Sequence, residues 1–174
     1  MEHAVEASVC LSEPLRHVRL ALTRDLGLLV AARTTADPSG RDRFESALAV
    51  EITSGTEVRQ AIVGELGPAA WADGALVVPV LWRPAGHEHV LPGFAGEFEL
   101  TTEPPGTRLV LRGAYTAPLG PVGRVGDWAA GRRVAARVLV GHLKWVAERI
   151  DGAARDAAAS EQERLGPASE NFIG

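Results

Sequence analysis

Two polar residues, Arg132 and His142, interrupt the apolar side of the longest helical pattern in the chain, residues 119–150. At 100° per residue, Arg132 falls inside the apolar stripe and His142 at its edge. Arg132 could bind the anionic end of a ligand, because a buried guanidinium needs an anion or water; a structural salt bridge or a solvent-directed side chain is the alternative. His142 could be a hydrogen-bond partner, a general acid or base, or a satisfied core residue. Proton transfer needs a second placed group that the sequence does not identify, so we assign no catalytic residue.

Tyr115 and Trp82 lie on the apolar faces of predicted strands, where each could present a polar tip to an enclosed space. Phe44 belongs to the same apolar pattern and could be either core or wall. If the space is closed, all of these residues are ordinary core. If it is open, the predicted ligand-binding residues are Arg132, His142, Tyr115, Trp82, Phe98, Phe94, Trp128 and Leu139.

Two further motifs resemble sites without meeting their requirements. Residues 87–89, His-Glu-His, carry metal-binding side chains, but alternate residues of an extended segment point to opposite sides and no third histidine lies nearby. Gly120, Gly123 and Gly126 lack the spacing of a phosphate-binding loop and the Lys-Ser/Thr that would follow it. We therefore expect no metal and no cofactor.

Length and composition restrict the class of protein. A chain of 174 residues with 46% apolar content is about one domain long and can bury one sizeable core. The net charge of −4 provides no broad basic field, so we expect no nucleic-acid partner. Cys10 is the only cysteine, which excludes an internal disulfide. No segment has the pattern of a signal peptide or a membrane span, which favours a cytoplasmic protein without membrane insertion.

Periodicity predicts the elements that must position these residues. Alternation of period two predicts strands over residues 3–11, 44–52, 58–66, 75–84, 94–101 and 107–116. Helical spacing predicts one helix or two short ones over residues 15–33, and residues 34–43 are predicted to be a loop. Pro79 should lie at a sheet edge or a bulge. The domain is expected to span residues 1–156, with a frayed or disordered tail from 157 to 174.

Consecutive strands joined by short turns pair antiparallel, and the long helix is the only element large enough to cover their apolar face. This order, with residues 9–14 (VCLSEP), 94–100 (FAGEFEL), 113–120 (GAYTAPLG) and 120–127 (GPVGRVGD), resembles the START/Bet v 1-like helix-grip (SRPBCC) superfamily. The chain looks especially like small bacterial polyketide cyclase/dehydrase and lipid-transport-like proteins. The resemblance implies an α+β fold in which a curved antiparallel sheet wraps around a long C-terminal helix.

The resemblance also implies an internal cavity between sheet and helix for a small hydrophobic or amphipathic molecule. The expected function is accordingly that of a carrier or sensor that binds such a ligand. A cyclase or dehydratase acting on a polyketide-like chain is one alternative, and an interaction protein with a closed cavity is another. The resemblance carries no shared catalytic motif onto numbered residues, because one fold hosts many functions.

Overall fold

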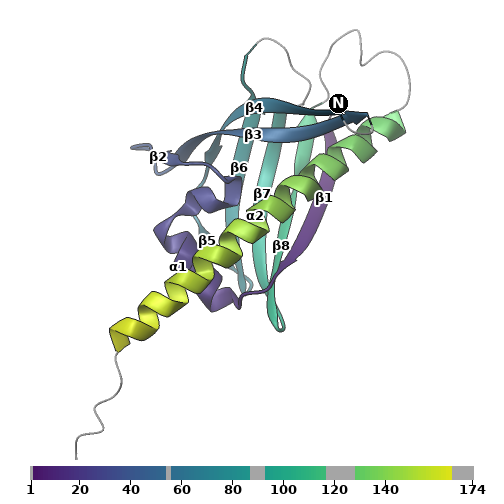
Figure 1. Ribbon diagram of the computed structural model, residues 1–174. Coiled ribbons are helices and arrows are strands. Elements are labelled where there is room, and N and C mark those ends of the chain that lie inside the picture. Colours follow the sequence, from purple (N-terminus) through teal and green to yellow (C-terminus); the bar gives the residue numbers. More distant parts are fainter. Residues whose placement is uncertain (1, 54–55, 87–92, 117–127, 166–174) are drawn as a thin grey trace, which may run out of the picture.

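One antiparallel sheet and one long helix account for most of the molecule (Figure 1). The computed structural model describes residues 2–53, 56–86, 93–116 and 128–165. The strands are β1 (Glu2–Leu11), β2 (Thr34–Ala36), β3 (Asp42–Thr53), β4 (Thr56–Leu66), β5 (Ala70–Ala72), β6 (Ala75–Pro84), β7 (Gly93–Glu103) and β8 (Gly106–Thr116). Their spatial order is β1-β8-β7-β6-β4-β3-β2, with β5 paired to β6. The first strand thus lies beside the last, and the helix α2 (Trp128–Leu165) crosses the curved sheet.

Two short helical elements follow β1, which resolves the alternative that the sequence left open. They are α1 (Leu15–Arg24) and the 3₁₀ helix η1 (Leu26–Val30). The break falls at Asp25, whose carboxylate accepts a hydrogen bond from the backbone N–H of Gly27 at 2.9 Å. An aspartate that caps a new helix start in this way terminates the preceding helix.

The long helix continues beyond the point at which the sequence predicted fraying. It runs to Leu165, whereas we expected an apolar stripe ending at Ile150 and a frayed segment from residue 157. Ala154 and Ala157 are almost fully buried, so the packed side of α2 continues past Ile150. Alanine is the strongest helix former, and its small side chain lets another element approach closely. The predicted start at residues 119–127 lies outside the described part of the chain.

Two short strands were missed, and one proline is accommodated in an unexpected place. β2 lies within the predicted loop and β5 follows β4; each has three residues, too few to show a period.

Pro79 lies inside the sheet, not at an edge: β6 pairs with β4 from Val80 onward and with β5 up to Val77. Its carbonyl accepts from Gly67 N at 2.8 Å on that side. The missing N–H therefore falls where the neighbouring strand changes, and no ladder bond is lost.

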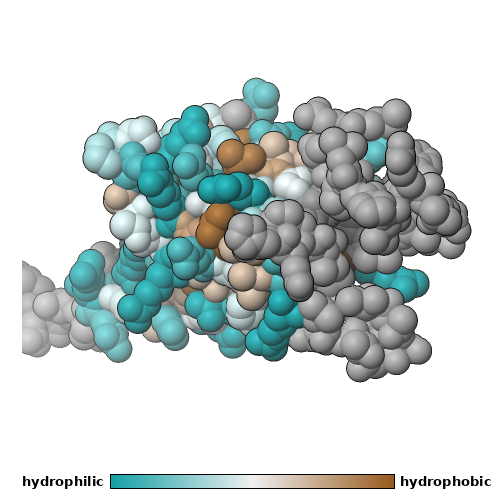
Figure 2. Space-filling model, turned by 90° about the horizontal axis from the view of Figure 1, so that it is seen from above, coloured by the Kyte–Doolittle hydropathy of each residue, from teal (hydrophilic) through white to brown (hydrophobic). Residues whose placement is uncertain are grey.

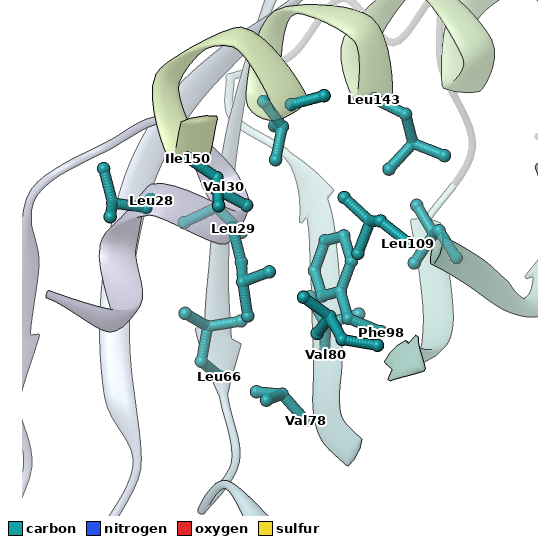
Figure 3. Close-up of a cluster of buried hydrophobic side chains, with 14 of the residues drawn as sticks. Leu28, Leu29, Val30, Leu66, Val78, Val80, Phe98, Leu109, Leu143 and Ile150 are labelled. Carbon is teal, nitrogen blue, oxygen red and sulfur yellow. The ribbon is translucent and has the colours of Figure 1, made fainter. Parts of the chain in front are cut away.

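The core lies between the sheet, α2 and η1. Figure 3 shows Phe98 of β7 among Val80 of β6, Leu109 of β8 and Leu143 of α2. Asp151 joins α2 to the end of β1, because its carboxylate accepts from Ser12 N at 3.0 Å and from Glu13 N at 3.1 Å. Among the described residues, no helix is long and apolar enough to span a bilayer.

Candidate ligand site between the sheet and helix α2

Four aromatic side chains form a row across the inner face of the sheet. The register places Phe44 opposite Gly64, Gly64 opposite Trp82, Trp82 opposite Phe94, and Phe94 opposite Tyr115. Directly opposed residues on neighbouring strands point to the same face, so the row runs from β3 to β8. All four side chains are buried. We call Phe44, Trp82, Phe94 and Tyr115 the aromatic row.

Glycines beside the aromatic row let its rings lie close to the sheet. A Cβ on Gly64 would come within 2.5 Å of Phe44 Cζ, and Cβ atoms on Gly96 and Gly113 would come within 2.8 and 2.7 Å of Phe94 Cζ. Each ring therefore covers a position at which any other residue would collide with it. Trp82 and Phe94 are stacked, with ring centroids 4.2 Å apart and planes 16° from parallel. The two rings thus pack face to face on the inner side of the sheet.

Tyr115 closes the row on the β8 side. Its ring lies 5.3 Å from that of His3, measured between centroids, on the neighbouring strand β1. The Tyr115 hydroxyl forms no hydrogen bond with a described residue, although the residue is only 8% exposed. Such a hydroxyl can bond to a ligand.

His142 is the buried titratable group of α2. The residue is 8% exposed, and its ring meets that of Trp145 edge-on, with centroids 6.2 Å apart. Burial lowers the pKa of His142 from its ordinary value of 6.5 to about 4. Desolvation penalises the charged imidazolium, so the side chain is neutral at pH 7.

The structure brings together part of the predicted set. Tyr115, Trp82 and Phe94 lie side by side in the aromatic row. Phe98 and Leu139 are buried in the core cluster that also contains the row, Phe98 four residues beyond Phe94 on β7. His142 is buried on α2. The backbone of Arg132 and Trp128 is part of α2, but the side chains of both residues lie outside the described part of the structure. Residues 87–89 and the glycines 120, 123 and 126 also lie outside it.

Sequence reasoning did not identify the role of the glycines. Gly64, Gly96 and Gly113 appear as ordinary strand positions, although a glycine inside a strand often marks the close approach of another group. That signal, combined with the register, would have found the aromatic row. The described residues contain no cluster of histidine, cysteine and carboxylate side chains suited to a metal.

Two hollows are lined by described residues of the sheet. One, of about 770 Å³, lies at β2, β3, β4 and β6, and its lining includes Phe44, Gly64 and Trp82 as well as Val63, Leu81 and Arg43. The other, of about 580 Å³, lies over β1, β7 and β8. Viewed from above, at the end of the molecule where β1 begins, apolar residues reach the surface between hydrophilic ones and the segments drawn in grey (Figure 2).

Solved structures share this architecture at low sequence identity. The protein TTHA0849 from Thermus thermophilus is 18% identical with a TM-score of 0.54, and the match covers 90% of this chain and 99% of that one. The di-domain ARO/CYC StfQ from the steffimycin biosynthetic pathway is 13% identical (TM-score 0.53), with 91% of this chain and 53% of that chain covered. Ara h 8.0201 is 13% identical with a TM-score of 0.53, and the match covers 90% of this chain and 99% of that one. No family model and no curated protein matches the chain.

These structures define the class of fold. The eight-stranded curved antiparallel sheet and the long C-terminal helix are those of the helix-grip fold, as the sequence predicted. Identities of 13–18% establish the fold and leave function to be argued from the site.

Proposed function

We propose that this protein binds a small, largely apolar molecule between the sheet and α2, with one face of the ligand against the aromatic row. The observation that carries the proposal is the stacked pair Trp82 and Phe94, in which Gly96 and Gly113 leave room for the Phe94 ring. Aromatic side chains favour a ring-containing ligand, because offset-stacked or edge-to-face contacts add about 0.5–1.5 kcal/mol beyond area burial.

The other predicted contacts complete this proposal. Tyr115 provides a hydroxyl at one end of the aromatic row, and Phe98 and Leu139 form apolar wall beyond it. Trp128 and Arg132 remain sequence-based predictions, because their side chains lie outside the described part of the structure. Two structures of the same fold are consistent with such a role by their names: StfQ, described above, and a STAR-related lipid transfer protein from Xanthomonas axonopodis, 13% identical with a TM-score of 0.51.

Binding of naphthalene, measured by ligand-observed NMR, tests the proposal. Trp82→Leu should weaken binding about tenfold, since about 1.4 kcal/mol of lost stacking and contact corresponds to a factor of ten. Trp71→Leu is the matched control, because Trp71 is exposed on β5 and lies outside the aromatic row. Native mass spectrometry of the purified protein should also detect a co-purifying small molecule.

Two results would contradict the proposal. The first is wild-type protein that shows no saturable binding of naphthalene. The second is an equal loss of affinity in both tryptophan variants while both melt as cooperatively as the wild type, since that would place the binding surface elsewhere.

A further inference from the structure

His142 has hydrogen-bonding capacity that the described part of the protein does not use. A neutral imidazole has one N–H donor and one nitrogen acceptor. His142 is more than nine-tenths buried, yet it forms no hydrogen bond with any described residue. A histidine that only filled the core would be satisfied by a backbone or side-chain group.

The direction of His142 follows from the position of Asp151 on the same helix. The Asp151 carboxylate binds the backbone where β1 ends, at Ser12 and Glu13. His142 lies nine residues earlier, so at about 100° per residue the two side chains point to opposite sides of α2. Away from β1 and α1, the helix contacts β3 and η1, with a smaller contact to β8, the neighbour of β1. From this arrangement we place His142 on the flank of α2 that faces β3, the strand that carries Phe44 of the aromatic row.

Building on the proposed function, we propose that His142 is the hydrogen-bond anchor of this site and that the ligand is a neutral aromatic molecule with a hydroxyl group. A hydroxyl both donates and accepts, so it can bond to either ring nitrogen in either tautomer. Its apolar rings would lie against Trp82 and Phe94, and its hydroxyl would reach across to α2.

Burial selects against a charged partner at this position. An anionic group would favour imidazolium, but desolvation opposes both the positive ring and the negative ligand group. The lowered pKa of His142 is consistent with this preference, because burial alone accounts for it. A hydroxyl forms its hydrogen bond without any proton transfer, so it meets no such penalty.

Three probes with the same two fused rings test the inference: naphthalene, 2-naphthol and 2-naphthoate. For the wild type we expect 2-naphthol to bind about fivefold more tightly than naphthalene, within the range of one neutral hydrogen bond, and 2-naphthoate to bind most weakly. His142→Phe should bind the first two probes equally. His142→Gln, which keeps a donor and an acceptor, should restore part of the preference for 2-naphthol.

The outcomes separate this inference from the proposed function. If His142→Phe keeps the fivefold preference, or if 2-naphthoate binds the wild type as tightly as 2-naphthol, the inference is overturned while naphthalene binding still supports the site. If the wild type binds none of the probes, both proposals fail. Should His142→Phe not fold, the ¹⁵N resonances of the wild-type His142 ring decide: they should shift with 2-naphthol and stay unchanged with naphthalene, and unchanged resonances with both would overturn the inference.

Discussion

At the scale of single residues, three strand glycines leave the space that two aromatic rings occupy. The ring of Phe44 covers Gly64, and the ring of Phe94 covers Gly96 and Gly113. A methyl group at any of these positions would displace a ring or part the strands, because the colliding atoms include backbone of the neighbouring strand. The aromatic row therefore depends on residues that contribute no side chain of their own.

Gly64→Ala should destabilise the fold by about 1–3 kcal/mol, the usual cost of overpacking. Its Cβ would come within 2.5 Å of Phe44 Cζ and would also meet the backbone carbonyl of Leu81. Urea denaturation measures the change as a lower midpoint at an unchanged slope.

Gly141→Ala is the matched control and should act in the opposite direction. Gly141 is an exposed residue inside α2, and a Cβ there would meet no atom within 4 Å. Alanine is favoured over glycine in a helix by about 0.5–1 kcal/mol, so this variant should be more stable than the wild type. Equal destabilisation by both substitutions would mean that steric crowding is not what sets the glycine positions.

The residues of the site could be predicted from the sequence only in part. Alternation alone placed Tyr115, Trp82 and Phe94 on the inner face of their strands. That these three form one row depends on the register of the sheet, because a shift of two residues would keep each on the inner face and separate them. Strand periodicity contains no information on such shifts, which are set by the connections between strands.

At the scale of elements, the Asp151 carboxylate hydrogen-bonds α2 to the end of β1. Asp151 accepts hydrogen bonds from two backbone N–H groups, those of Ser12 and Glu13, immediately before α1 begins. Hydrogen bonds to a charged group contribute more to stability than neutral ones, and removing the acceptor would leave both donors unmatched. This contact fixes the rotation of α2 about its axis, and with it the flank on which His142 lies.

Asp151→Ala should lower the free energy of unfolding by about 2 kcal/mol. Asp151→Asn should lower it less, because one side-chain oxygen remains as an acceptor. Asp156→Ala, five residues later on an exposed position of α2, should change stability little. Chemical denaturation of the three variants checks the order, and a loss in Asp156→Ala as large as in Asp151→Ala would show that helix charge, not the β1 contact, is responsible.

Helix and strand lengths were predicted less well than their order. The six long strands and both helical regions follow from periodicity, because each runs for enough residues to show a period of 2 or 3.6. The three-residue strands β2 and β5 are fixed by pairing with neighbours, which a local pattern does not contain. α2 extends beyond Ile150 because Ala154 and Ala157 are buried, and alanine alone does not mark an apolar stripe.

At the scale of the whole molecule, the curved sheet and α2 enclose a region with few charges, and His142 is the titratable residue that burial there affects most clearly. Its environment makes protonation unfavourable only while the chain is folded. The stability of the whole molecule is therefore coupled to the charge of one ring.

The free energy of unfolding should fall as the pH is lowered from about 6.5 to about 4. Between these values the unfolded chain, in which the pKa of His142 is 6.5, binds a proton that the folded chain, with a pKa of about 4, does not bind. Each pH unit within this window costs about 1.4 kcal/mol, whereas above pH 6.5 both states are neutral and below pH 4 both are charged. His142 should thus lower the stability of the folded protein between about pH 6.5 and pH 4 and should have no effect on its pH dependence outside this range.

His142→Leu isolates this contribution from that of the other titrating groups. The variant replaces the neutral imidazole with an uncharged side chain of similar size, so near pH 7.5 its stability should be close to that of the wild type. Near pH 4.5 the variant should be the more stable of the two proteins. Urea denaturation of both proteins at half-unit steps of pH measures the difference between the two curves. Parallel curves would mean that the folded protein accommodates imidazolium as readily as water does, and a neutral hydrogen-bond anchor facing β3 would then have no physical basis.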